Sequence, residues 1–310
     1  MSMQTDECIE CHGKRTVTCR RCKGTGQEIK SDFQRIYITS WDKILSCKRD
    51  FEGKYWIFRG QPDAELPLET LLDRHCKRFL NDLKVAPDRE KLLLREFQRR
   101  YHQYTTDIPK ESDILEWFSI MQHYGAPTRL LDFTYSISIA SFFALEKARM
   151  EEASWNCSIW AVNARWAQDL SASLFEGTLE HCYFNNPVEK ESAPNFEKVF
   201  MRDTPKEFIC PVNPFRLNER LTIQKGIFMC PGDVTMTFEE NLKLMNGHDS
   251  DKNIIKFVIT LEKDEWRKAL DALYDQNITR AVLFPGLEGF ATSLTVSPPK
   301  FLLPANENAS

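Results

Sequence analysis

Thr128-Arg129-Leu130-Leu131-Asp132-Phe133-Thr134 is the stretch of this sequence that decides its fold. It predicts a strand that runs directly into a helix, and the apolar residues of that helix are Ile139, Ala140, Phe143, Ala144 and Ala148. Helical patterns dominate the chain before this stretch, and strand patterns dominate after it. Helices and strands in separate blocks are typical of an α+β fold rather than of repeated βαβ units. We therefore expect mixed helices around a largely antiparallel sheet.

Three helical segments are predicted upstream of this stretch. The first carries apolar residues at spacings of three and four, as an amphipathic helix requires. Pro87-Asp88 opens the second, and Ser112-Asp113 caps the third, which stops at Gly125-Ala126-Pro127. The apolar positions of the three segments are Leu68, Leu72, Cys76, Phe79 and Leu83, then Leu93, Phe97, Tyr101 and Tyr104, then Leu115, Phe118 and Met121.

Strand patterns flank this helical section on both sides. Residues 53–59 are β-prone, with Gly60 ending the strand, and the clearest later strands are 158–162 and 253–259. We expect a helix at 263–276, then a strand at 278–284 that Pro285-Gly286 ends. Residues 171–218 lack periodicity and predict mostly loop. The expected domains are a metal-binding module at 1–30, an α+β domain at 31–300 and a loose tail at 301–310.

Composition excludes several classes of protein. The chain has 310 residues, with 41 Lys and Arg against 45 Asp and Glu, a balance unlike that of a wholesale polyanion binder. With 42% hydrophobic residues it has enough apolar surface to build a core. No apolar run approaches the roughly 18 residues that span a bilayer, and the first residues lack the pattern of a signal peptide. We therefore expect a cytoplasmic protein without a membrane partner; its oligomeric state stays open.

Four of the ten cysteines form the pattern C-x2-C-x7-C-x2-C, namely Cys8, Cys11, Cys19 and Cys22. Two such pairs supply the four thiolates of a tetrahedral zinc site, which leaves no open coordination position, so we expect structural Zn²⁺. A glycine follows each pair, and it lets backbone N–H groups turn toward the thiolates. His12 is a substitute ligand that four cysteines make unnecessary. A redox dithiol or a chance pattern explains two glycine-marked pairs less well.

Five basic residues and no acidic one lie between Cys11 and Gln27. Such a basic knuckle could contact the phosphates of a nucleic acid. The alternative, which we favour, is that these charges offset the negative tetrathiolate and stay solvated. The six remaining cysteines are scattered and indicate small core residues or inert thiols.

The paired cysteines resemble the C-x-x-C-x-G-x-G repeats of the DnaJ cysteine-rich region and its zinc-binding relatives. The second pair matches in full through Gly26, whereas Lys14 replaces the second glycine of the first pair. Because this resemblance covers about 20 residues, it implies the metal site and not a chaperone activity.

Ordered sequence blocks in the rest of the chain resemble the FRG domain family. The resemblance spans roughly residues 40 to 295, and the family name carries little settled chemistry. The blocks are Phe58-Arg59-Gly60-Gln61, the stretch from Gln122 to Thr134, the helix with Ala140, Phe142, Phe143 and Ala144, Glu219 to Phe228, and Leu283 to Gly289.

Polar residues recur beside glycines at the expected strand ends in these blocks. Arginine gives planar, bidentate recognition of phosphate or carboxylate, and glycine lets a ligand approach the backbone. The alternative is a purely structural role, in which an arginine forms a buried ion pair with Asp132 and His123 is a core residue. Taken together, the blocks favour one polar cleft, with Arg59, Arg129, Gln224 and His123 as its ligand-binding residues.

One arrangement in this cleft is similar to the arginine, then serine or threonine, then glutamate order of ADP-ribosyltransferases. The resemblance implies that Arg59 holds the phosphates of NAD, that Thr134 supports the nicotinamide ribose, and that Glu288 is the catalytic carboxylate. The function expected from it is NAD binding and ADP-ribose transfer to an unknown acceptor, in a defence or toxin-like role by analogy.

The rival hypothesis is a non-catalytic module that binds nucleic acid or a protein partner. Other enzyme classes fit less well. The chain has no H-x-x-H or H-x-H pair for a metal-dependent hydrolase, no Walker or Rossmann fingerprint, and no G-x-S-x-G motif.

Overall fold

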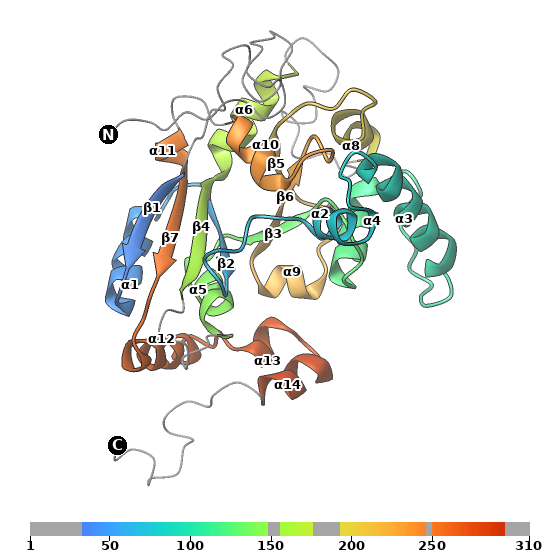
Figure 1. Cartoon of the computed structure of the whole chain (residues 1–310). Coiled ribbons are helices and arrows are strands. Elements are labelled where there is room, and N and C mark those ends of the chain that lie inside the picture. The colour runs from blue at the N-terminus through green and yellow to red at the C-terminus, as the bar shows by residue number, and fades with distance from the viewer. Residues whose placement is uncertain (1–32, 148–155, 176–192, 246–249, 295–310) are drawn as a thin grey trace, which may run out of the picture.

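The computed structural model describes residues 33–147, 156–175, 193–245 and 250–294. They form an α+β fold around one seven-stranded sheet in the order β1-β7-β4-β2-β3-β6-β5 (Figure 1). β1 pairs with β7 in parallel, and every other neighbouring pair is antiparallel. The expected fold class is therefore confirmed. The strands are β1 (Gln34–Ile38), β2 (Trp56–Gln61), β3 (Leu131–Thr134), β4 (Cys157–Asn163), β5 (Ile209–Val212), β6 (Gly226–Pro231) and β7 (Ile254–Ile259).

Helices cover both faces of this sheet. The longer ones are α1 (Trp41–Asp50), α3 (Ala86–Tyr101), α4 (Ile114–His123), α5 (Ile137–Leu145), α6 (Ala164–Ser173), α8 (Ala193–Phe200), α10 (Phe238–Met245) and α12 (Lys263–Asp275). The shorter ones are α2 (Leu71–His75), which continues into the π-helical turn η1 (Cys76–Leu80), then α9 (Glu219–Ile223), α11 (Ser250–Asn253), α13 (Arg280–Leu283) and α14 (Leu287–Ser293).

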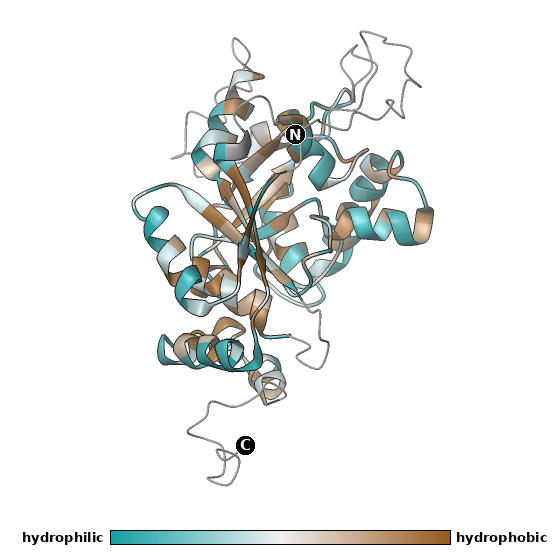
Figure 2. Cartoon of the chain, turned by 60° about the vertical axis from the view of Figure 1, so that its left-hand side comes forward, coloured by the Kyte–Doolittle hydropathy of each residue, from teal (hydrophilic) through white to brown (hydrophobic). Residues whose placement is uncertain are grey.

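Two large hydrophobic clusters pack against the two faces of the sheet. On β2, Ile57 belongs to one cluster and its neighbour Phe58 to the other, as the alternation of side chains along a strand requires. The first cluster packs under α3, α4, α6, α8 and α10, and the second under α1, α5 and α12. The central strands run through the apolar middle of the molecule, with polar residues on the outer helices (Figure 2).

The predicted junction between strand and helix is confirmed. β3 ends at Thr134, and Ser136 caps α5 by accepting a hydrogen bond from the backbone of Ile139 at 3.3 Å. The cap of the third helix is confirmed too, since Asp113 accepts from the backbone of Glu116 at the start of α4. These caps are local signals, and they need no tertiary contact to be recognised in the sequence.

Some sequence-based boundaries are wrong. Residues 280–283 form helix α13 rather than part of a strand, because the Thr279 side chain caps the backbone N–H of Val282. The stretch 171–218 contains α8 and β5, where we expected mostly loop. Gly60 lies within β2, which continues to Gln61.

Other predictions fall outside the described residues. The cysteines expected to bind zinc, Cys8, Cys11, Cys19 and Cys22, lie there with the basic knuckle and the tail at 301–310. The zinc site, its contact with nucleic acid and the three domain limits therefore stay predictions.

Candidate functional site

A cavity of about 280 Å³ opens beside the strand ends of β2 and β3. Its walls come from β2, β3, the end of α5, α9 and α13, which meet in the lower middle of Figure 1. Three arginines from three different elements line it, so we call it the arginine cavity. The lining side chains used below are Arg59, Asp132, Thr134, Phe143, Glu146, Arg220, Gln224, Arg280 and Phe284.

Arg59 is half-buried at this cavity, and its position depends on the neighbouring glycine. A Cβ atom at Gly60 would lie 1.9 Å from the backbone oxygen of Ala140, so only glycine lets α5 pack this close to β2. The Nη1 atom of Arg59 donates to the backbone oxygen of Asp132 at 2.7 Å, and its Nε has no hydrogen-bond partner. Burial lowers the pKa of Arg59, although the Asp132 carboxylate acts against that effect. A guanidinium remains charged under such conditions, so the site holds a cation that is only partly compensated.

Arg280 reaches the same cavity from α13. Its Nη1 donates to both carboxylate oxygens of Glu146, at 2.9 and 2.8 Å, and its guanidinium lies 4.4 Å from the ring centroid of Phe284. The Glu146 side chain is 5% exposed, so this is a nearly buried ion pair. The Nε of Arg280 is buried without a partner, as is that of Arg59. An unpaired buried donor costs free energy, which a ligand with acceptor oxygens would recover.

Arg220 is the third cation, and it comes from α9. Its guanidinium lies 4.7 Å from the Phe284 ring centroid, and it has no hydrogen-bond or ion-pair partner within the described part of the chain. Burial and the charge of Arg220 lower the pKa of His123, whose Nδ1 is buried without a partner. His123 therefore stays neutral near pH 7, although it does not line the arginine cavity.

Asp132 provides a carboxylate in this cationic surrounding. Its Oδ2 accepts a hydrogen bond at 2.7 Å from the side chain of Gln122 at the end of α4. The oxygen of that amide in turn accepts from the hydroxyl of Thr128 at 2.6 Å. This chain of bonds orients the carboxylate and leaves its second oxygen without a hydrogen-bond partner among the described residues.

Thr134 and Gln224 line the cavity but also hold its walls together. The Thr134 hydroxyl donates to the backbone oxygen of Gln224 at 2.7 Å and accepts from the backbone of Ser136 at 3.0 Å. The Gln224 side chain donates to the backbone oxygen of Leu283 at 2.9 Å, which ties α9 to α13. The donor of Thr134 is thus occupied by a structural bond, whereas the side-chain oxygen of Gln224 keeps acceptor capacity.

Besides His123, two more predicted site residues, Arg129 and Glu288, lie away from the cavity. Arg129 is 1% exposed and bonds through Nε and Nη2 to Glu90, while its Nη1 donates to the backbone oxygens of Phe200 and Pro231. Arg129 therefore has the structural role given above as the alternative, a buried ion pair, with Glu90 rather than Asp132 as its partner. Glu288 is exposed in the first turn of α14 and does not line the cavity.

The structure therefore joins three of the expected residues, Arg59, Thr134 and Gln224, and adds others that sequence reasoning missed. Arg220 stood within a recognised block, but only Gln224 was singled out there. Arg280 was not recognised as a site residue because it lies near the start of the segment 278–284, which was wrongly predicted to be a strand. The missed residues are Arg220, Arg280, Glu146 and Phe284.

The site thus combines three guanidinium groups, an oriented carboxylate and aromatic rings, which is a class of cavity suited to a phosphate-bearing ligand. Residues 54–153 match the family model of the FRG domain. This match supports the FRG resemblance over these residues, which include the β2, β3 and α5 walls of the cavity, whereas the blocks at 219–228 and 283–289 lie outside the match. No curated protein matches the chain, and no solved structure matches it.

Two further findings concern the described residues. No helix among them is long and apolar enough to cross a membrane. They also contain no group of three or more His, Cys, Asp or Glu side chains placed to hold a metal ion.

Proposed function

We propose that the arginine cavity binds the phosphates of a nucleotide, with NAD as the first candidate. The observation that carries the proposal is the convergence of Arg59, Arg220 and Arg280 on one small cavity. The Nε atoms of Arg59 and Arg280 are buried without a partner, and the Arg220 guanidinium has no hydrogen-bond partner among the described residues. Like charges at close range repel each other, so an anion would stabilise this cluster. A phosphate group presents several acceptor oxygens, so one such group can accept from more than one of these guanidinium groups.

The dimensions of the cavity restrict how such a ligand sits. A volume of about 280 Å³ is at the small end of the range for ligand pockets. It accommodates the phosphates and one ring, with the remainder of a dinucleotide extending through the opening. Phe143 and Phe284 supply ring surfaces inside the cavity, and Phe284 already contacts two guanidinium groups.

ADP-ribose transfer is the second step of the proposal, and Asp132 is its catalytic carboxylate. The bond between ribose C1′ and the nicotinamide nitrogen breaks, and nicotinamide leaves as a neutral molecule with the electron pair. A hydroxyl or amine of the acceptor adds to C1′ and loses its proton. A carboxylate beside C1′ stabilises the positive charge that develops on the sugar. Asp132 has an oxygen free for this role, whereas Glu146 is paired with Arg280 and Glu288 lies outside the cavity.

Calorimetric titration tests the binding step with NAD, ADP-ribose and inorganic phosphate. We expect Arg220→Ala to weaken NAD and ADP-ribose binding by roughly tenfold or more, since a hydrogen bond to a charged group is worth about 1.5–3 kcal/mol. The side chain of Arg220 makes no hydrogen bond among the described residues, so we expect its removal to leave the fold intact. Arg35→Ala, at an exposed arginine of β1, is the matched control and should bind as the parent protein does. Equal binding by both variants would refute the site.

Nicotinamide release, measured by chromatography, tests the transfer step separately. We expect Asp132→Asn to bind NAD with nearly unchanged affinity and to release nicotinamide at least a hundredfold more slowly. If the parent protein binds NAD but releases none, the cavity is a binding site only, as the non-catalytic alternative holds.

A further inference from the structure

A fourth cation, Lys147, lines the arginine cavity just after the end of α5. It directly follows Glu146, the C-cap residue of that helix, whose carboxylate forms the nearly buried ion pair with Arg280. Lys147 itself is exposed, so it stands at the opening of the cavity rather than inside it. It has no hydrogen-bond or ion-pair partner among the described residues.

The charges that line the arginine cavity do not balance. Four cations face two carboxylates there, which leaves two formal positive charges in excess. Arg280 is neutralised by its ion pair, and the carboxylate of Asp132 compensates Arg59 in part. Arg220 and Lys147 keep their full charge, because neither has an anionic partner in the described part of the chain. The lining therefore lacks two negative charges, which a ligand can supply.

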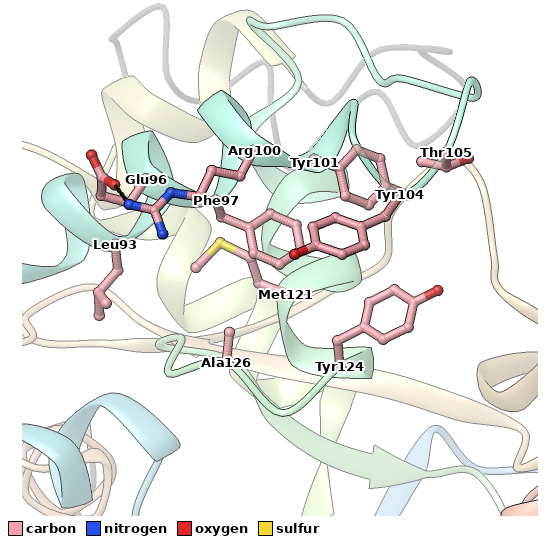
Figure 3. A pocket seen from close by; sticks show the side chains of 10 residues that line it. All are labelled: Leu93, Glu96, Phe97, Arg100, Tyr101, Tyr104, Thr105, Met121, Tyr124 and Ala126. Atoms are coloured by element: carbon pink, nitrogen blue, oxygen red, sulfur yellow. Dashed lines mark hydrogen bonds and ion pairs between the residues drawn. The ribbon is translucent and has the colours of Figure 1, made fainter.

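A larger pocket between α3 and α4, of about 560 Å³, has no such excess. Its charged lining residues are Glu96 and Arg100, and they form an ion pair with each other at 3.0 Å (Figure 3). Most of its other side chains are aromatic or apolar, as Phe97 and Met121 are. Of these two hollows, only the arginine cavity thus carries the unbalanced charge that an anionic ligand requires.

The hydrogen-bond donors of the arginine cavity lie at two depths. The Nε atoms of Arg59 and Arg280 are buried without a partner, whereas Lys147 stands in solvent at the opening. A phosphate group that accepts from the inner donors sits inside the cavity, away from the ammonium group of the lysine. A second phosphate joined to the first would extend outward and meet that ammonium group.

We infer that the cavity selects a ligand with two linked phosphates, with the inner phosphate on the arginines and the outer one on Lys147. The inference rests on the nucleotide site proposed above, and it names the diphosphate bridge as the part of the ligand that is recognised. Each phosphate of such a bridge carries one negative charge, so the bridge supplies the two charges that the lining lacks. A phosphate monoester also approaches two charges above its second pKa near 6, but it carries them on one phosphorus atom. The ligand class is therefore a dinucleotide or a nucleoside diphosphate sugar, and not a nucleoside monophosphate.

Calorimetric titration with ADP-ribose and AMP at pH 8 tests this inference, because both ligands then carry about two negative charges. A lysine that acts only through its long-range field affects both ligands alike, whereas one that contacts the outer phosphate affects ADP-ribose alone. We expect the parent protein to bind ADP-ribose more tightly than AMP. Lys147→Ala should weaken ADP-ribose binding about fivefold, the upper end for an exposed ion pair, and leave AMP binding unchanged. Lys43→Ala, at an exposed lysine of α1, is the matched control and should bind both ligands as the parent protein does.

The outcomes separate this inference from the nucleotide site itself. Equal affinity of the parent protein for the two ligands would overturn the inference, and so would a Lys147→Ala variant that weakens both equally or neither. In each of these cases the nucleotide site would still stand. Arg220→Ala should weaken both ligands, since it removes one of the arginines assigned to the inner phosphate. A parent protein that binds neither ligand would refute the nucleotide site and the inference together.

Discussion

The buried carboxyl group of Asp73 links two helices, α2 and α10. It is 2% exposed, and its Oδ2 accepts from the backbone of Thr70 at 2.9 Å and from that of Phe238 at 3.2 Å. It thereby caps α2 and fixes α10 to it. Burial raises the pKa of Asp73 to about 6, against the lowering effect of these hydrogen bonds.

This pKa predicts a specific dependence of stability on pH. Because the folded value exceeds the ordinary value of about 3.9, the folded state holds the proton more tightly. The resulting stabilisation is complete below about pH 4 and is lost as pH rises through about 6. A shift of about two units corresponds to roughly 3 kcal/mol. We expect Asp73→Asn, which keeps an acceptor oxygen, to remove this part of the pH dependence.

Urea unfolding of both proteins between pH 4 and 8 measures the effect. The difference in unfolding free energy between the parent protein and Asp73→Asn should change by about 2–3 kcal/mol across this range. A difference that stays constant with pH would contradict the raised pKa.

The packing of α5 on β2 is the contact between elements on which the arginine cavity depends. Gly60 allows it, since an added Cβ would meet the backbone oxygen of Ala140 at 1.9 Å and the backbone nitrogen of Ala144 at 2.7 Å. Neither atom belongs to a flexible side chain, so the helix itself would have to move. We expect Gly60→Ala to destabilise the protein by about 3 kcal/mol, the upper end of typical overpacking costs.

Gly53→Ala is the comparison for that measurement. A Cβ at Gly53 meets nothing within 4 Å, and only its φ of +70° opposes the substitution. We expect a cost of about 1 kcal/mol there. If chemical unfolding showed Gly60→Ala to be the milder of the two changes, the close approach of α5 to β2 would be wrong.

The elements themselves also show where sequence reasoning succeeds. The α4 cap at Asp113 and the turn from β3 into α5 depend on neighbouring residues, and both could be predicted. The run from Ile278 to Phe284 is short and apolar, and such a run does not distinguish a strand from a buried helical turn. The Thr279 cap decided in favour of the helix.

At the scale of the whole molecule, the arginine cavity could be predicted only in part. Arg59 and Gln224 were found because they stand in recognisable blocks of sequence. Arg220 and Arg280 were missed because their meeting depends on how α9 and α13 pack together, which no local pattern encodes. For Arg129 the error is the opposite one. It was expected to bind a ligand, because it stands in the longest block, but it pairs with Glu90 in the core.

The cysteines among the described residues are poor candidates for binding zinc, so measuring the zinc content of the chain tests the site predicted at its N-terminus. Cys47, Cys76, Cys157, Cys210 and Cys230 are all buried and free. Burial raises the pKa of each of these thiols, to about 12 for Cys157. A protonated thiol is a poor metal ligand, and the described residues contain no cluster that could hold a metal ion. Zinc bound to this chain would therefore point to the cysteines outside the described residues.

We expect the full chain to carry one zinc ion, measured by mass spectrometry of the metal content after dialysis. The double variant Cys19→Ser/Cys22→Ser should lose it, because two thiolates do not complete a tetrahedral site. Cys47→Ala, in α1, should keep the metal, since that thiol is buried and isolated. A parent protein without zinc would refute the site, and equal metal loss in both variants would show that zinc retention reflects general stability rather than ligation.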